Sequence, residues 1–343
     1  VGIVKGRNAV IFKASSRALK CTAETVRMMR EGLKKVGAPE DLIQILEDPG
    51  RDGIAELMRV SDLVVATGSG AVVRAAYSSG TPAYGVGQGN AVAIVAEDAD
   101  LVEAAEMICA SKLFDYATSC SSENAVITVA DVYEQFMEEM SAHGCHLVSG
   151  ADRETLRNHM WKVNAKGRLA LNPDVIAKSA QVIADGAGIS VPDGTDILLV
   201  EGREPIADDK FHDEKISPVL TIYKAADFQD AYRILTELTS RVGRGHSCGI
   251  HTWRRDYIDY LGTHMKTSRV TVRQPMSAGN GGHPFNRMPS TATLGCGTWG
   301  GNITTENVHW KQFINVTWVN EPVSPWGFTD EEMWDEFWKK HGK

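Results

Sequence analysis

The chain has 343 residues, of which 43% are hydrophobic and 23% charged, and its formal net charge is -8 at pH 7. This length is enough to bury a large core and predicts two domains. The negative charge argues against nucleic acid or an anionic membrane surface as the main partner. No apolar run in the sequence is long enough to span a bilayer. We therefore expect a globular enzyme that acts on small molecules.

The first ninety residues alternate strand and helix signals. Strands are predicted at 8–12, 42–46, 62–67 and 82–86, and helices at 22–36, 54–58 and 71–79. The strand at 62–67 is apolar almost throughout, so we expect it to be covered on both faces, as in a parallel sheet. Strand-helix-strand repeats of this kind predict a doubly wound, Rossmann-type fold that binds a nucleotide cofactor.

A second α/β pattern begins after Asn90. A helix at 99–111 with one apolar face is followed by a polar loop and a strand at 125–129. Asp131 is predicted to cap the next helix, which ends before Gly144. Further strands are expected at 197–200, 219–223, 270–272 and 313–319.

These patterns divide the chain into three parts. We predict a nucleotide-binding domain at 1–92, a catalytic domain at 93–310, and a segment at 311–343 with an oligomerisation strand and the C-terminal tail. The chain begins at Val1, without a methionine, and runs almost directly into a strand. We therefore expect the first domain to be incomplete at its N-terminus.

The six cysteines are scattered, and no two of them form a Cys-x-x-Cys pair. Such spacing supports neither a zinc ribbon nor a thioredoxin-type site, and the histidines show no metal-ligand spacing, so we predict no metal. Dispersed thiols are typical of a reduced, cytoplasmic protein. Five cysteines are expected to be small core residues, and Cys120 is the exception.

Cys120 lies in the polar loop 114–124, between a predicted helix and a predicted strand. A cysteine in such a loop is accessible to a substrate, and neighbouring amides can lower its pKa. Its thiolate adds readily to an aldehyde, and the resulting thiohemiacetal can lose hydride to a nicotinamide. The alternative is an inert, half-buried cysteine, because most single cysteines are unreactive.

Two short segments are candidates for binding cofactor phosphates. Gly68 and Ser69 follow a predicted strand and open a helix, whose first amides could hold a phosphate. A tight turn that needs positive φ explains the glycine equally well. The run from Lys13 through Ser15 and Ser16 to Arg17 ends the first strand, where a parallel sheet places its ligands. A solvated loop is the alternative.

Five segments, in order, resemble the coenzyme A-acylating branch of the aldehyde dehydrogenase superfamily, over residues from about 8 to 320. They are 66–70 (ATGSG), 85–90 (GVGQGN), 111–123 (SKLFDYATSCSSE), 214–219 (EKISPV) and 294–302 (LGCGTWGGN). The resemblance implies that Cys120 is the nucleophile and that Glu214 contacts the nicotinamide ribose. It also implies that Gly68 and Ser69 form the turn under the cofactor phosphates, and that Lys13 contacts the adenosine ribose.

Departures from the hydrolytic relatives indicate the acyl acceptor and the cofactor. Those relatives carry a glutamate that activates water, whereas residues 85–90 contain no carboxylate. A coenzyme A thiolate needs no such base, so thioester transfer to coenzyme A is favoured over hydrolysis. Many NAD-preferring relatives have a glutamate where Ser16 stands, next to Arg17. This favours NADP, although NAD is also compatible.

One further departure concerns the oxyanion site. The family's oxyanion asparagine lies upstream of the first predicted strand, and this chain has no equivalent. Loss of one oxyanion donor typically lowers the rate by about 10²–10³. The resemblance therefore leaves open a catalytically silent scaffold as an alternative to an enzyme.

The run 274–289 (QPMSAGNGGHPFNRMP) differs from acetaldehyde enzymes and is similar to the acylating sulfoacetaldehyde dehydrogenases. A guanidinium can bind a sulfonate through two oxygens, so Arg287, with His283 or Arg273, is the candidate site for a small anionic aldehyde. The alternatives are a local ion pair for this arginine and a neutral substrate such as acetaldehyde. The strand at 313–319 resembles the segment through which this family forms homodimers or homotetramers.

Overall fold

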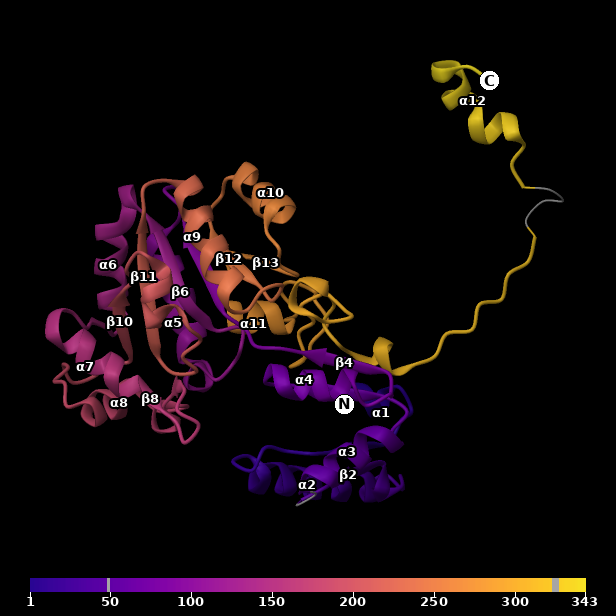
Figure 1. Cartoon of the computed structure of the whole chain (residues 1–343), viewed down its shortest axis with the longest axis horizontal. Coiled ribbons are helices and arrows are strands. Elements are labelled where there is room, and N and C mark those ends of the chain that lie inside the picture. Colours follow the sequence, from indigo (N-terminus) through magenta and orange to yellow (C-terminus); the bar gives the residue numbers. More distant parts are fainter. Residues whose placement is uncertain (48–49, 323–326) are drawn as a thin grey trace.

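The structure is a computed structural model that describes residues 1–47, 50–322 and 327–343. Its centre is a seven-stranded, all-parallel sheet in the order β13-β12-β5-β6-β11-β10-β7 (Figure 1). The strands are β5 (Ala91–Val95), β6 (Glu123–Val129), β7 (Cys145–Leu147), β10 (Ile197–Glu201), β11 (Val219–Ala225), β12 (Cys248–His251) and β13 (Val270–Val272). The strands predicted at 125–129, 197–200, 219–223 and 270–272 all belong to this sheet.

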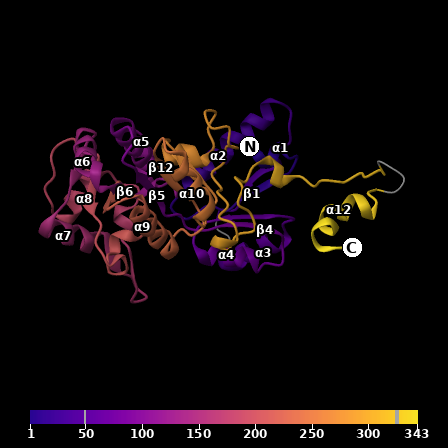
Figure 2. The same cartoon turned by 90° about the horizontal axis from the view of Figure 1, so that it is seen from above.

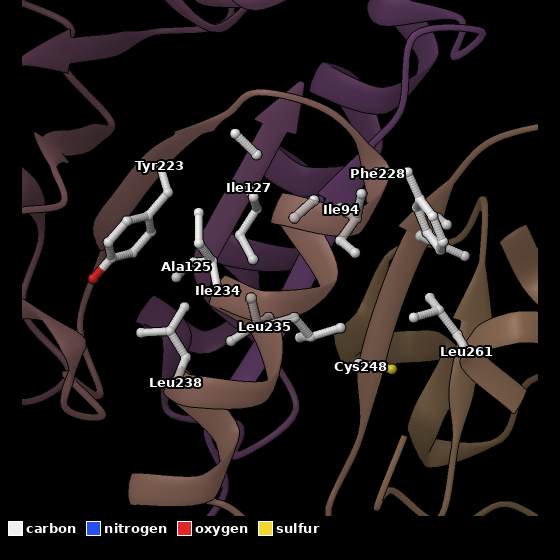
Figure 3. Close-up of a cluster of buried hydrophobic side chains, with 14 of the residues drawn as sticks. Ile94, Ala125, Ile127, Tyr223, Phe228, Ile234, Leu235, Leu238, Cys248 and Leu261 are labelled. Atoms are coloured by element: carbon white, nitrogen blue, oxygen red, sulfur yellow. The ribbon is translucent and has the colours of Figure 1, made fainter. Parts of the chain in front are cut away.

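Helices cover both faces of the sheet, because successive side chains of each strand point to opposite sides. Ile94 of β5 packs in the core beneath α9 (Phe228–Arg241) and α10 (Arg255–His264). The next residue, Val95, packs beneath α5 (Leu101–Leu113) and α6 (Tyr133–Ala142). Figure 3 shows the first core, where Leu235 of α9 lies over the sheet near Ile127. Complete burial of each such side chain contributes about 1.5–3 kcal/mol.

A third hydrophobic core lies at the end of the sheet formed by β10 and β7. Here α7 (Gly150–Met160) and α8 (Ala180–Ala187) cover Leu198 and Val200, beside the antiparallel hairpin of β8 (Trp161–Val163) and β9 (Leu169–Leu171). Arg153 is buried here and pairs with Asp209 at 2.7 Å. These elements cover the end of the central sheet that is farthest from β12 and β13.

The N-terminal lobe confirms the predicted alternation of strands and helices. The short α1 (Gly2–Lys5) is followed by β1 (Val10–Phe12), α2 (Leu19–Lys35), β2 (Ile43–Ile45), α3 (Gly50–Val60), β3 (Val64–Thr67), α4 (Gly70–Tyr77) and β4 (Ala83–Val86). β1 pairs with β2 and β3 with β4, both in parallel. Figures 1 and 2 place this indigo-to-purple lobe beside the larger one.

One prediction for this lobe was wrong. β3 is not covered on both faces, because Val64 and Ala66 are buried whereas Val65 and Thr67 are exposed. The reason is its position in a two-stranded sheet, where only one face has a core beneath it. An apolar run of this length does not distinguish one covered face from two.

Two elements of the second pattern also differ from the prediction. β5 was not predicted; all of its residues are buried in the central sheet, and the proposed boundary at 92 falls inside it. Asp131 does not cap α6, since the helix begins after a 3-10 turn at Ala130–Val132 and has no side-chain cap. The domain division as a whole stays a prediction.

The C-terminal segment contains no strand at 313–319. A 3-10 turn at Trp310–Phe313 is followed by residues 314–322, which pair with no strand in the described part of the chain. The turn is tied to the N-terminus, because Asn8 Nδ2 donates to the Phe313 carbonyl oxygen at 2.6 Å. α12 (Asp330–His341) stands apart from both lobes in Figures 1 and 2. Within the described ranges, no helix has the length and apolar character needed to cross a membrane.

Candidate active site

Loops from five neighbouring strands converge at one edge of the central sheet. Cys120 lies just before β6, Glu214 before β11, His246 before β12 and Arg269 before β13. The passage 87–90 leads into β5, between β12 and β6. Because the strands are parallel, all of these residues lie at its amino edge. The sheet order therefore brings together residues that are up to 182 positions apart in the sequence (87 and 269).

Two buried asparagines tie these loops together. Asn124 Nδ2 donates to Asn90 Oδ1 at 2.6 Å and to the Asp213 carbonyl at 2.9 Å. Asn124 Oδ1 accepts from the Lys215 amide at 3.2 Å. Glu214 lies between Asp213 and Lys215, which both bond to Asn124, so its position is fixed relative to the loop that carries Cys120.

The passage into β5 lies unusually close to Cys120. A Cβ atom on Gly89 would lie 2.1 Å from the Cys120 carbonyl oxygen, which is far inside van der Waals contact. Glycine is therefore required here because of this close approach. Val86 and Gln88 are its near neighbours, and the passage 85–90 brings no carboxylate to Cys120.

Cys120 is in hydrogen-bond contact with a histidine. His246 Nε2 lies 3.3 Å from Cys120 Sγ, and Nδ1 lies 2.8 Å from Ser247 Oγ. Burial, with the positive charge of Arg269, lowers the pKa of His246 to about 3, so the ring is neutral. In a neutral imidazole one nitrogen donates and the other accepts, so either Nε2–H donates to sulfur while Nδ1 accepts from Ser247, or Nε2 accepts from the thiol while Nδ1–H donates to Ser247.

The expected lowering of the Cys120 pKa was wrong. Burial, followed by Glu214 and Cys296, raises the pKa of this thiol to about 12. Its backbone amide and Arg269 act in the opposite direction, but burial outweighs them because a thiolate is poorly stabilised away from water. The free chain therefore holds Cys120 as a thiol at neutral pH.

Glu214 is a buried carboxylate whose charge acts on Cys120, and Lys112 is a buried lysine whose charge acts on Glu214. Burial raises the pKa of Glu214 to about 7, opposed by a hydrogen bond from Gln88 and by Lys112 and Lys215. Burial lowers the pKa of Lys112 to about 7, opposed by Glu123 and Glu214. Both groups can change protonation near neutral pH, so the charge beside Cys120 is adjustable there.

A pocket of about 290 Å³ adjoins this edge. Its wall is formed by Gly87, Gln88, Arg241, Val242, Gly243, Arg244, Cys296, Trp299 and Gly300. The pocket therefore joins the passage into β5 to the loop before β12. Among the residues that the structure describes, no cluster of three His, Cys, Asp or Glu side chains is placed to hold a metal.

The predicted phosphate-binding residues lie in the N-terminal lobe. Lys13, Ser15, Ser16 and Arg17 are exposed after β1, at its carboxyl end. Gly68 has a φ of 147°, and the next residue, Ser69, is the N-cap of α4 without a side-chain cap bond. The first amides of α4 are therefore available to an anion. These assignments stay predictions, and only Glu214 of the cofactor set lies at the Cys120 edge.

The predicted sulfonate-binding residues lie in different places. Arg273 follows β13 at its carboxyl end, donates to the Thr252 carbonyl at 2.7 Å and stacks 3.5 Å from the Trp253 ring. Arg287 and His283 are exposed in the loop after α11 (Met276–Gly281). That helix begins beside the Cys120 loop, because the Met276 amide donates to Glu123 Oε1 at 3.0 Å.

Sequence reasoning missed His246, Lys112 and Arg269 as site residues. The glycine-flanked segment 243–246 before a strand was the available signal for the histidine, and nothing marked the other two. Of the five cysteines expected in the core, four are buried, whereas Cys21 is exposed on α2 because the outer side of that helix has no partner.

Comparison with known proteins gives one consistent family. The family model described as "Aldehyde dehydrogenase family" matches residues 3–286 of this chain. The sulfoacetaldehyde dehydrogenase (acylating) of Bilophila wadsworthia (strain 3_1_6) is 80% identical over 343 residues, which are 100% of this chain and 74% of that protein.

Solved structures agree. An acetylating aldehyde dehydrogenase from Geobacillus thermoglucosidasius superposes with a TM-score of 0.87 at 33% identity, over 94% of this chain and 71% of that one. A Rhodopseudomonas palustris propionaldehyde dehydrogenase with bound CoA and an acylated cysteine has a TM-score of 0.78 at 25% identity, over 90% and 67% of the two chains. The chain therefore belongs to the aldehyde dehydrogenase family, in the branch whose named members are acylating.

Proposed function

We propose that this protein oxidises sulfoacetaldehyde to its acyl-coenzyme A thioester with NAD(P)+, through a thioester on Cys120. The observation that carries the proposal is Cys120 Sγ held 3.3 Å from His246 Nε2 in a site whose passage 85–90 brings no carboxylate to activate water. Hydrolytic relatives carry their water-activating glutamate in this passage and this chain does not, while Glu214 is assigned to the nicotinamide ribose; hydrolysis is therefore expected to be slow, and a thiol can accept the acyl group. The 80% identity to an acylating sulfoacetaldehyde dehydrogenase supports the same substrate.

The residues of the chain divide the chemistry between them. The Cys120 thiolate adds to the aldehyde carbon, while His246 holds the sulfur through Nε2–H. A bound nicotinamide supplies the acceptor for the hydride that this carbon loses. Cys120 then carries the acyl group as a thioester until the coenzyme A thiol displaces it and the cysteine thiol is restored.

The N-terminal lobe fits a dinucleotide. The available amides of α4 would hold phosphates, Lys13 would contact the adenosine ribose, and Glu214 would contact the nicotinamide ribose. Ser16 leaves room for a 2′-phosphate beside Arg17, so we propose NADP as the preferred cofactor, with NAD as the alternative. We place the reaction in the cytoplasm, since all six cysteines are free thiols.

The C-terminal segment supports assembly into a homodimer or homotetramer. Val316, Trp318 and Val319 are 67%, 87% and 85% exposed, and this stretch pairs with no strand in the described ranges of its own chain. An unpaired extended segment of this kind can add to the sheet of a second copy. We propose that 313–319 acts as an intermolecular strand.

The first test measures NAD(P)H formation from sulfoacetaldehyde with and without coenzyme A. We expect steady turnover only with coenzyme A, and a loss of at least about 10³-fold in Cys120→Ala, because the loop 114–124 contains no other thiol. Cys21→Ala removes an exposed thiol on α2 and serves as the matched control. Turnover that persists in Cys120→Ala, or no reduction with any aldehyde, would contradict the proposal.

A second test separates the anionic substrate from a neutral one. Arg287 is an exposed arginine in the loop after α11 and is proposed to bind the sulfonate with His283. Arg287→Met should raise KM for sulfoacetaldehyde about tenfold or more, since a guanidinium–sulfonate pair is lost, and leave the KM for acetaldehyde unchanged. Arg255→Met, on exposed α10, is the control. Equal efficiency with both aldehydes in the unchanged protein would instead favour a neutral substrate.

A further inference from the structure

Arg269 is a buried cation without a carboxylate partner in the described part of the chain. Its side chain is 6% exposed, and every acceptor that it reaches is neutral. Nε donates to Asn307 Oδ1 at 2.9 Å, Nη1 to the carbonyl oxygens of His246 at 3.1 Å and Gly295 at 2.9 Å, and Nη2 to that of Thr305 at 3.3 Å. The guanidinium keeps its full positive charge in this environment.

Arg153 is a buried arginine with a structural role, and it has a carboxylate partner. It is 3% exposed and pairs with the buried carboxylate of Asp209 at 2.7 Å. A buried charge without a counter-ion is strongly unfavourable, and hydrogen bonds to carbonyl oxygens compensate for it only in part. Arg269 is therefore expected to face a group that becomes negative during the protein's work.

The hydrogen bonds of Arg269 locate that group. Nη1 holds the backbone of His246, whose ring lies 3.3 Å from Cys120 Sγ. The same nitrogen holds Gly295, the residue before Cys296. The guanidinium thus lies behind the two loops that carry His246 and Cys296, on the side of the sheet edge where Cys120 reacts.

We propose that Arg269 is a positioning residue that stabilises the thiolate of Cys120, so that the reactive state is a thiolate beside a neutral His246 and not a thiolate–imidazolium pair. The inference rests on the proposed function only in taking Cys120 as the nucleophile. Ionisation releases the Sγ proton to solvent, and the thiolate accepts a hydrogen bond from His246 Nε2–H in the tautomer that this state requires.

The charges around the site support this reading. Burial, followed by the positive charge of Arg269, lowers the pKa of His246 to about 3, and the charge of Arg269 also acts to lower the pKa of Cys120. Both effects favour thiolate with neutral imidazole. Burial, Glu214 and Cys296 oppose ionisation by raising the Cys120 pKa. Among the described residues, Arg269 is the one cation that shifts this pKa.

The rate of Cys120 alkylation by iodoacetamide, followed by peptide mass spectrometry from pH 6 to 9, tests the proposal. Below the pKa, the rate is proportional to the thiolate fraction, so one unit of pKa is about tenfold in rate at every pH. In the unchanged chain, the logarithm of the rate should rise by about one per pH unit. A plateau across this range that persists in Arg269→Met would show a thiolate stabilised without Arg269, as in a thiolate–imidazolium pair, and would overturn the proposal.

Two substitutions then separate charge from hydrogen bonding. Arg269→Met removes both and should slow alkylation about tenfold or more, whereas Arg269→Lys keeps the charge and should stay within about threefold. Equal slowing in both variants would assign Arg269 a structural role only, and no slowing in Arg269→Met would remove it from thiolate activation. Cys21, exposed on α2, is the internal reference thiol, whose rate should not change.

This readout needs neither aldehyde nor coenzyme A. Unchanged alkylation in Arg269→Met together with normal turnover would refute the proposed role of Arg269 and leave the proposed function intact. The expected alkylation pattern together with absent turnover would refute the proposed function and leave the role of Arg269 intact. Far-UV circular dichroism and thermal melting of each variant establish that it is folded.

Discussion

The thiol of Cys120 illustrates how environment decides reactivity at the scale of one residue. Burial raises its pKa to about 12, and Glu214 adds to the effect through its negative charge. Glu214 itself titrates near 7, because burial raises its pKa against the opposing effects of Gln88, Lys112 and Lys215. The charge that opposes thiolate formation is therefore present above about pH 7 and absent below it.

This coupling gives a prediction with a defined sign. Glu214→Gln should increase the rate of Cys120 alkylation by about threefold or more at pH 9, where the native carboxylate is ionised and disfavours the thiolate. At pH 6 the native carboxyl is mostly protonated, so the two proteins should react at similar rates. Mass spectrometry of the alkylated peptide measures both rates.

Glu138→Gln is the control for that measurement. Glu138 is exposed on α6, away from the amino edge, and its substitution should leave the alkylation rate unchanged at both pH values. An identical rate for Glu214→Gln and the native chain at pH 9 would show that Glu214 does not act on the sulfur.

At the scale of the elements, the position of the site follows from strand direction. Ligands of open parallel sheets usually bind beyond the carboxyl ends of the strands. Here Cys120, His246 and Arg269 precede β6, β12 and β13, so the site lies at the amino edge of the central sheet. In the N-terminal lobe, the predicted phosphate residues follow their strands in the usual manner.

Close packing of loops makes this amino edge possible. The chain approaches Cys120 through Gly89, where even a methyl group would collide with the Cys120 carbonyl. The buried side chains of Asn90 and Asn124 bond to each other. Asn124 also donates to the Asp213 carbonyl oxygen, so this part of the irregular backbone has a partner where water is excluded. The rigidity of the site therefore comes from buried polar contacts between loops.

At the scale of the whole molecule, the last helix is independent of the rest. α12 is capped by its own residues, since Thr329 and Glu332 form a reciprocal capping box, and it buries no residue. Both views of the chain place it away from the two lobes (Figures 1 and 2). Its contribution to the stability of the lobes is expected to be negligible.

Removal of residues 327–343 should consequently leave the thermal midpoint within about 2 °C of the intact chain, because none of these residues is buried in a core. Leu261→Ala is the contrasting variant: Leu261 is the fully buried residue on the core-facing side of α10, and its truncation should cost about 2–5 kcal/mol. Differential scanning calorimetry measures both midpoints. A large drop on truncation would mean that α12 packs on a lobe or on a second copy in solution.

The sequence by itself determined the family, the α/β class and the position of Cys120 in a loop between a helix and a strand. These features are local, since each depends on residue order and on periodicity within a few neighbouring positions. The buried strand β5 escaped prediction, because a run of five apolar residues after a glycine-rich passage has no period that identifies it.

The tertiary structure decided which groups surround Cys120 and how they alter it. His246 and Arg269 are 126 and 149 residues further along the chain, and only the strand order brings their loops to the same edge. The pKa of Cys120 was also beyond the sequence, because it depends on burial and on charges contributed by three separate loops. Electrostatic effects act through space, and the order of residues along the chain does not specify those distances.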